Sequence, residues 1–422
     1  MKKLLVVLLV LGLAAPAMAA PQWFWYGSGR LNVGYISNSQ ELRAQTGGQA
    51  INSIPGNDPS IQPTGTQSGG HDDAGWVDMP TQAQRVGAKV VTSDAISGQV
   101  EIRYIDADTN WRLGSDVYPY RGLYFRQIYG NWKFGEGSLR VGQDYTPATF
   151  LLYSNSIGDS AFDGDEVGVT GGIPYISSQP QVKLTMYGFQ FAIMEANKSN
   201  SMGTVKYLTG IQALPTTTGA NAGDIDYNLP RIELAYQWNS PMISLRPILG
   251  YQAYDAVTRT GTNGATETSK TITSYLYGLG ANIRLGAGYI NITAAGNQNG
   301  ANYGLWQTNT YQTNRGCIIN GEAKDSTGIQ GMLVAGFKIN PMLTAEAGYA
   351  INKTEGYSIA TTGKTENTWQ QYYAQLPITA APGVIFTPEF GVFDFGENKY
   401  ADGSKTKLGT STYFLVQARI DF

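Results

Sequence analysis

Apolar and polar side chains alternate over one short run after another, and this two-residue period constrains the fold more than any other feature of the sequence. In the run 342–353, apolar side chains occupy the odd positions from Leu343 to Ile351, while Thr344, Glu346 and Asn352 occupy even positions. The runs 231–238 and 274–285 alternate in the same way. Because successive side chains of a β-strand point to opposite faces, each run predicts a strand with one apolar and one polar face.

Sixteen such runs can be marked along the chain. They cover residues 23–36, 82–93, 97–108, 122–135, 138–145, 180–187, 189–197, 230–239, 242–255, 271–285, 287–297, 328–340, 342–353, 368–379, 383–396 and 409–422. Helical periodicity is almost absent after residue 20, so an all-β fold is predicted.

The connections between these runs alternate between short and long. The short ones are tight turns of turn-forming residues, such as Asn239-Ser240-Pro241, Asn340-Pro341 and Ala381-Pro382-Gly383. The long ones are 37–81, 109–121, 146–179, 198–229, 256–270, 298–327, 354–367 and 397–408. An even strand number with short turns at one rim and long loops at the other is typical of an outer-membrane barrel. The predicted fold is an antiparallel, up-and-down transmembrane β-barrel of 16 strands, with short periplasmic turns and long extracellular loops.

Membrane physics explains why such a sheet closes. Lipid cannot hydrogen-bond an exposed backbone, so a sheet that crosses the bilayer must have no free edge. The interior of a 16-stranded barrel is too wide for side chains to fill and stays wet. Aromatic residues near the strand ends are expected to form the interfacial girdles, with ordinary cross-strand packing as the alternative. They are Trp23, Trp25, Tyr26, Tyr35, Tyr251, Tyr254, Trp369 and Tyr372.

The first residues predict export. Lys2 and Lys3 precede an apolar stretch that ends in the small-residue site Ala17-Met18-Ala19, which indicates a signal peptide over residues 1–19 and a mature barrel over residues 20–422. A single cysteine, Cys317, excludes a disulfide framework. With 29 Lys and Arg against 32 Asp and Glu, the chain has no basic footprint for nucleic acid.

Two segments carry a family resemblance. The C-terminal strand alternates apolar residues back from Phe422, and this looks like the signature that outer-membrane barrels present to the barrel-assembly machinery. Residues 122–147, with Arg126 before an aromatic-glycine stretch and then Gly137-Ser138 and Gly142, resemble the general trimeric porins of Gram-negative bacteria. The resemblance implies a homotrimer in the outer membrane, in contact with lipid and lipopolysaccharide, that lets small hydrophilic solutes and ions diffuse passively.

In that family the third long loop folds into the barrel and narrows it, and here the corresponding loop is 146–179. It carries four acids, Asp159, Asp163, Asp165 and Glu166, and has Phe162-Asp163-Gly164-Asp165-Glu166 where family members often have Pro-Glu-Phe-Gly-Gly. Alternation places basic side chains on the polar side of the facing strands, at Arg30, Arg85, Lys89, Arg103 and Arg140. Alternation is ambiguous at Arg126, and the resemblance places it in the lumen. Acidic side chains on the loop opposite basic side chains on the wall predict an electric field across the pore and a modest selectivity for the charge of the permeating ion.

Other functions remain open alternatives. The only histidine, His71, lies in a polar loop beside Asp72 and Asp73, so no hydrolase site, metal site or cofactor is predicted and the protein is not expected to be an enzyme. A substrate-specific channel for anions or sugars is the nearer alternative. A barrel sleeve around a periplasmic electron carrier is a third, although the chain has no Cys-x-x-Cys-His.

Overall fold

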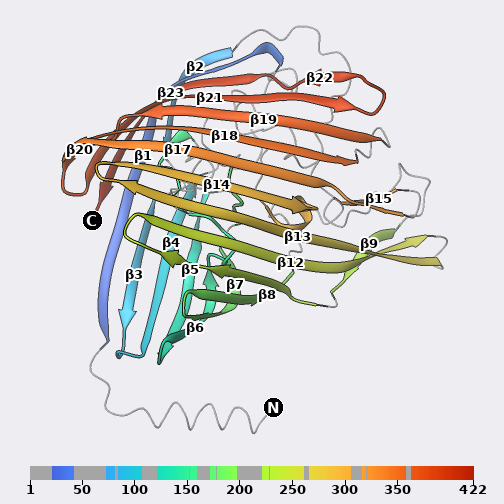
Figure 1. Ribbon diagram of the computed structural model, residues 1–422, viewed down its shortest axis with the longest axis horizontal. Coiled ribbons are helices and arrows are strands. Elements are labelled where there is room, and N and C mark those ends of the chain that lie inside the picture. Colours follow the sequence, from blue (N-terminus) through green and yellow to red (C-terminus); the bar gives the residue numbers. More distant parts are fainter. Residues whose placement is uncertain are drawn as a thin grey trace.

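Figure 1 shows the computed structural model, in which β-strands form the wall of a barrel. The structure describes residues 21–41, 73–80, 84–106, 121–151, 153–158, 172–176, 178–196, 221–227, 229–260, 266–305, 316–319, 322–357 and 363–422. Among these residues, no helix is long and apolar enough to cross a bilayer. The predicted signal peptide and His71 lie outside the described residues.

The strands follow one another along the chain with each neighbour antiparallel. The first half comprises β1 (Gln22–Asn38), β2 (Asp73–Pro80), β3 (Arg85–Val91), β4 (Ile96–Asp106), β5 (Arg121–Phe134), β6 (Gly137–Asp144), β7 (Gln179–Met186), β8 (Phe189–Met194), β9 (Asn221–Asp226), β10 (Arg231–Tyr236) and β11 (Trp238–Asn239). The second half comprises β12 (Ile243–Thr260), β13 (Thr266–Leu285), β14 (Gly288–Gln298), β17 (Thr327–Asn340), β18 (Leu343–Tyr357), β19 (Lys364–Gln375), β20 (Ile378–Ala381), β21 (Val384–Tyr400), β22 (Lys405–Lys407) and β23 (Thr410–Asp421). A helical turn, α3 (Gly300–Tyr303), and a separate hairpin of β15 (Cys317–Ile319) and β16 (Glu322–Lys324) lie between β14 and β17.

Several of these segments lie end to end within one strand of the barrel. β1 pairs with β3 through residues 22–28 and with β2 through residues 31–38, so β2 and β3 form one strand. The segments β9 to β11, β19 with β20, and β22 with β23 combine in the same way. The barrel closes where β1 pairs with β23, with Arg30 opposite Arg419 and Tyr35 opposite Phe414. The predicted closed, antiparallel barrel of 16 strands is confirmed.

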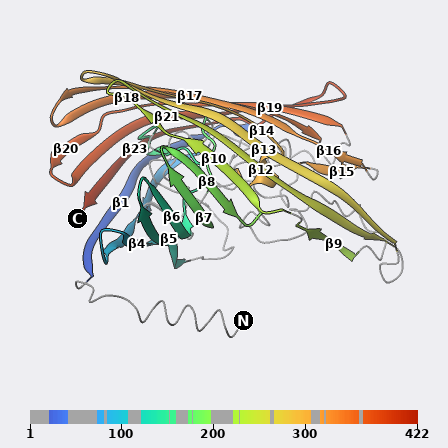
Figure 2. The same cartoon turned by 60° about the horizontal axis from the view of Figure 1, so that its bottom comes forward.

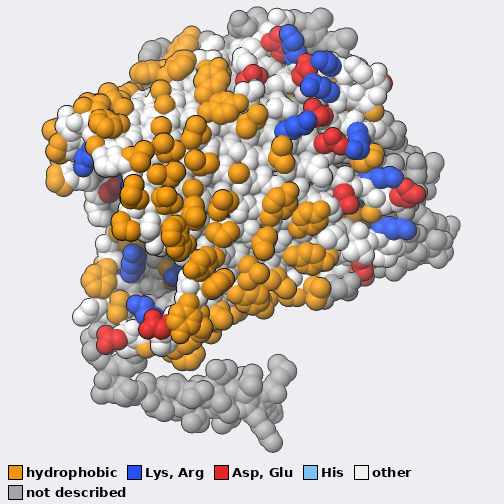
Figure 3. All heavy atoms as spheres, in the orientation of Figure 1, with side chains coloured by type: hydrophobic (Ala, Val, Ile, Leu, Met, Phe, Trp, Pro, Cys, Tyr) orange, Lys and Arg blue, Asp and Glu red, His pale blue; other side chains and the backbone are white. Residues whose placement is uncertain are grey.

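The two faces of the wall differ as alternation predicted. Along β1, Leu31, Val33 and Tyr35 are exposed on the outside, whereas the intervening Asn32 is fully buried on the inside. Figure 3 shows the outcome on one side of the molecule, where apolar side chains cover the strands near the short turns and charged side chains collect toward the long connections. The outer face therefore suits hydrocarbon over most of the height of the barrel.

The wall is taller on one side than on the other. β12, β13 and β21 contain 18, 20 and 17 residues, whereas β6, β7 and β8 contain 8, 8 and 6. Figure 2 shows the long strands reaching well past the short ones toward the long connections.

Parts of the predicted loops are strand. The expected loop 256–270 is paired up to Thr260 opposite Thr266, and the expected loop 37–81 contains β2. The reason is that backbone pairing continues beyond the bilayer, where alternation of hydrophobicity is no longer required.

The predicted aromatic girdles are partly wrong. Trp23, Trp25, Tyr35, Tyr251 and Tyr372 are exposed on the outside, as expected for a girdle. Three of the predicted members point inward instead: Tyr254 and Trp369 are buried, and the hydroxyl of Tyr26 donates to Glu101. They occupy the inner positions of their strands, so their aromatic character serves packing inside the barrel rather than the lipid interface.

Candidate functional site: the lumen and its inward segments

The chain that follows β6 runs across the inner face of the barrel. Residues 145–158 and 172–176 bury Phe150, Tyr153 and Ile173 in an apolar cluster with side chains from the tall wall. The wall contributes Ala235, Ile248, Leu276, Ala295, Met332, Val334, Ala350 and Tyr373. The two parts of the inward segment are also joined to each other, because Phe150 N donates to Pro174 O and Thr149 Oγ1 donates to Ile176 O. Packed apolar side chains therefore occupy one side of the lumen.

Three wall carboxylates hold this segment by its backbone. Glu233 on β10, Glu346 on β18 and Glu389 on β21 are 0%, 3% and 1% exposed, and each accepts hydrogen bonds from the segment. Glu233 Oε2 accepts from Ala148 N at 2.8 Å, and Glu346 Oε1 accepts from Asn155 N at 3.0 Å. Since buried N–H groups without acceptors cost free energy, these acids fix where the segment can lie.

Glu389 makes the densest of these contacts. Its Oε1 accepts from Ser156 Oγ, Gly158 N and the Tyr413 hydroxyl, and its Oε2 accepts from Ile157 N, all at 2.8 Å. From the other side, Asn32 Nδ2 donates to Ile157 O at 3.3 Å. The segment thus reaches from the tall wall to β1, the strand that closes the barrel.

A second segment, which sequence reasoning missed, also folds over the inner face. Residues 299–305, including α3, pack Tyr303 against β10 and β12, with its hydroxyl donating to Glu233 Oε1 at 3.0 Å. Arg231 lies over the Tyr303 ring and donates to Tyr303 O at 3.1 Å. Gly250 makes room for this contact, because a Cβ there would lie 1.9 Å from the Tyr303 hydroxyl oxygen. A lone glycine facing inward on β12 was the only signal in the sequence.

The wall of β1 and β3 to β7 carries the predicted basic residues, and acids accompany several of them. Arg126 is the extra residue of a bulge, since Glu101 pairs with Gln127 and Ile102 with Phe125. The bulge turns Arg126 inward, where it forms a buried ion pair with Glu101 and donates to the Tyr145 hydroxyl. This explains why alternation was ambiguous at that position.

Arg140 and Lys183 share a second acid. Asp144 accepts from Arg140 Nη1 at 2.5 Å and from Lys183 Nζ at 2.6 Å, and the Arg140 guanidinium lies 4.0 Å from the centre of the Tyr129 ring. The wall is therefore a mixed network rather than a purely basic surface.

The remaining predicted residues are placed as follows. Arg85 lies opposite Arg103 and has its Nε 3.9 Å from Glu101, while Lys89 is exposed opposite Gln99. Arg30 is buried on the inner face and lines a cavity together with residues 155–157 of the inward segment, while its role as a basic residue of the pore wall stays a prediction. The predicted loop acids Asp159, Asp163, Asp165 and Glu166 lie outside the described residues.

Solved structures resemble this chain over nearly its whole length. The outer membrane channel DcaP of Acinetobacter baumannii is 14% identical, with a TM-score of 0.60 and coverage of 95% of this chain and 97% of that one. Salmonella typhi OmpF, solved in complex with daunomycin, is 12% identical with a TM-score of 0.51, covering 95% of this chain and 97% of that one. OmpT of Vibrio cholerae is 12% identical with a TM-score of 0.50, covering 96% and 98%. The chain has the fold of the Gram-negative outer-membrane porins. No protein-family model and no curated protein matches the sequence.

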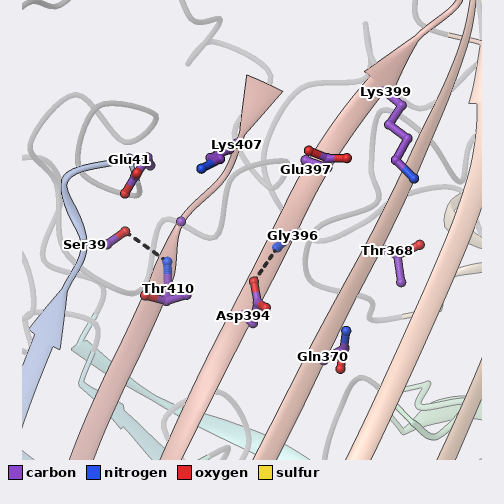
Figure 4. A pocket seen from close by; sticks show the side chains of 11 residues that line it. Ser39, Glu41, Thr368, Gln370, Asp394, Gly396, Glu397, Lys399, Lys407 and Thr410 are labelled. Atoms are coloured by element: carbon purple, nitrogen blue, oxygen red, sulfur yellow. Dashed lines mark hydrogen bonds between the residues drawn. The ribbon is translucent and has the colours of Figure 1, made fainter. Parts of the chain in front are cut away.

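This porin-fold barrel has a further cavity that does not belong to its lumen. Figure 4 shows this cavity, called here the rim cavity, which has a volume of about 400 Å³ and is lined by Ser39, Glu41, Thr368, Gln370, Asp394, Gly396, Glu397, Lys399, Lys407, Gly409 and Thr410. Its Gln370 accepts from the hydroxyl of Tyr349, which is exposed on the outer face. The rim cavity therefore lies outside the wall, on the side of the long connections and just beyond the outer aromatic residues.

Proposed function

We propose that the protein is a passive diffusion pore for small hydrophilic solutes and ions. The observation that carries this proposal is a closed 16-stranded barrel in which many inward side chains are polar or charged, while the described inward segments pack against the tall side of the wall. A barrel of this size that is not filled keeps a continuous water path, and a solute crosses it down its own gradient without any chemical step. The DcaP neighbour is an outer membrane channel, which agrees with this role.

We further propose that charge selectivity is modest. The loop acids Asp159, Asp163, Asp165 and Glu166 would face the basic side chains of β3 to β6 and produce a transverse field at the narrowest point. The ion pairs made by Glu101 and Asp144 offset part of the basic charge, and this supports weak rather than strong preference for one sign of ion.

The test is the single-channel current of folded protein in planar bilayers, with the reversal potential measured across a salt gradient. Discrete open-pore steps with a small reversal potential are expected, and silence from correctly folded protein refutes the function. Replacing Asp163 and Asp165 by Asn should shift the reversal potential toward anion preference. An unchanged reversal potential removes these two acids from the constriction.

The same experiment separates the alternatives. A substrate-specific channel would conduct ions until its solute is added and blocks the current, and a sleeve for an electron carrier would hold that carrier during purification. A homotrimer is proposed on the family resemblance, and native mass spectrometry in detergent measures it directly.

We also propose a lipid contact at the rim cavity. Its lysines and acids (Figure 4) lie on the outer face at the height where the headgroups of the outer leaflet are expected, which suits the phosphates and bridging cations of lipopolysaccharide.

A further inference from the structure

A second cavity, called here the inner cavity, lies inside the barrel close to the short turns. It has a volume of about 330 Å³, within the usual range for small-molecule sites, and lies between residues 155–157 of the inward segment and the wall formed by β1, β18, β21 and β23. Ile385 and Arg419 lie near the short-turn ends of β21 and β23, and Arg30, in the middle of β1, pairs directly with Arg419. A solute that has passed the inward segment would reach this cavity before leaving the pore.

The charge of the inner cavity is one-sided. Arg30 and Arg419 occupy directly opposite positions on β1 and β23, and none of the described residues that line the cavity is acidic. Like charges opposite each other on neighbouring strands are unfavourable, so an anion between them is stabilised by both. Guanidinium groups suit a carboxylate in particular, because their N–H donors match its two oxygens.

The arginines are held in position by polar partners. Arg419 forms an ion pair with Asp421, with Nε donating to both oxygens at 2.9 and 2.8 Å and Nη2 2.8 Å from Oδ2. Arg30 Nε donates to Ser28 Oγ, which in turn donates to Asp421 Oδ1. Asp421 thus orients both side chains but offsets only part of their charge. The nearby acids Glu346 and Glu389 are occupied by hydrogen bonds from the inward segment and from Tyr373 and Tyr413.

The rest of the lining is partly apolar. Ile157, Ile385 and the Tyr289 side chain line the cavity together with the amide of Gln417. Such a surface favours a solute with a short hydrocarbon or aromatic body and disfavours a small ion that keeps its full hydration shell.

We infer that the inner cavity is a binding subsite for small organic carboxylates with a short apolar body. The carboxylate lies between Arg30 and Arg419, and the body packs on Ile157 and Ile385. The transport role of this subsite rests on the proposed pore. In an open pore, the subsite would raise the local concentration of such solutes at the inner end of the path.

Benzoate titrated calorimetrically into the full-length folded protein in detergent tests the subsite without requiring current. Benzoate is expected to bind at least tenfold more tightly than acetate or inorganic phosphate. Arg30→Gln should weaken benzoate binding about tenfold or more, in line with a charge-assisted hydrogen bond worth about 1.5–3 kcal/mol. The matched control Lys338→Gln removes a charge from the inner side of β17 outside the cavity and should leave binding unchanged.

Should Arg30→Gln fail to fold, Arg419→Lys keeps the charge but loses the planar fork, and a severalfold loss of benzoate affinity is expected. Equal binding of benzoate and phosphate, or equal losses in Arg30→Gln and Lys338→Gln, overturns the subsite. Bilayer currents recorded in parallel keep the two ideas apart. Currents without benzoate binding reject the subsite alone, whereas benzoate binding without currents rejects the pore alone.

Discussion

Glu389 offers the sharpest test of how the inward segment is held. In Glu389→Ala, the N–H groups of Ile157 and Gly158 lose the carboxylate that accepts them at 2.8 Å. A buried polar group left without a partner costs about 1–3 kcal/mol, so the two groups together cost about 2–6 kcal/mol. At 1.4 kcal/mol per factor of ten, the local opening equilibrium should rise about 30-fold to 10⁴-fold.

Hydrogen–deuterium exchange measures this change peptide by peptide. A peptide covering residues 153–158 should exchange faster by that factor, whereas a peptide covering residues 145–151 should change little, because Glu233 still accepts from Ala148 N. Glu389→Gln should give a smaller increase, since the amide oxygen can still accept but the amide nitrogen faces a donor.

The control for Glu389 is another glutamate on the same strand. Glu397→Gln on β21 alters an exposed ion pair with Lys405 at the rim and should leave exchange at 153–158 unchanged. If exchange in Glu389→Ala matched the wild-type rate, the buried carboxylate would not be what holds the segment, and the reasoning from its hydrogen bonds would be refuted.

Three further outcomes are expected. Gly250→Val should displace Tyr303, because the added Cβ would lie 1.9 Å from its hydroxyl oxygen, and exchange at 299–305 together with single-channel conductance should rise. Arg126→Met removes the buried ion pair with Glu101, which keeps the Tyr26 hydroxyl and the more distant Arg85, and a cost of up to about 3–5 kcal/mol should lower the unfolding temperature in detergent. Replacing Lys399 and Lys407 together by Gln should weaken binding of lipopolysaccharide in native mass spectrometry by up to about 2 kcal/mol, at about 1 kcal/mol per lysine, while conductance stays unchanged.

The strands could be predicted because lipid imposes a strict rule on the outer face. Every outward side chain at bilayer depth must be apolar, so alternation survives in the sequence at positions such as Leu31, Val33 and Tyr35. The rule does not hold beyond the bilayer, and there the prediction ended β12 and β18 too early. Alternation also does not detect a bulge. The inward direction of Arg126 was therefore predicted from the family resemblance and not from the pattern of side chains.

The inner face could not be predicted in the same way. Ile248, Leu276 and Met332 are apolar side chains on faces that alternation assigns to water. Their partners, Phe150 and Tyr153, are about 100 or more residues away in the sequence, so no local pattern relates them. Alternation correctly assigned Glu346 to the polar side of β18. The role of Glu346 as an acceptor for Asn155 N depends on a contact made only in the folded barrel.

The apolar cluster also sets how the pore can respond to change. Burying Phe150, Tyr153, Ile173 and Ile176 stabilises the docked segment by about 1.5–3 kcal/mol each, or about 6–12 kcal/mol together. This exceeds the 2–6 kcal/mol that loss of one carboxylate costs, so a single substitution such as Glu389→Ala should open residues 153–158 locally and leave the cluster docked. The width of the pore is then set by core-like packing, whereas its ion preference is set by side chains that can be exchanged without moving the segment. Charge substitutions in the lumen should therefore alter the reversal potential with little change in conductance, and conductance should change greatly only when the apolar cluster itself is disrupted.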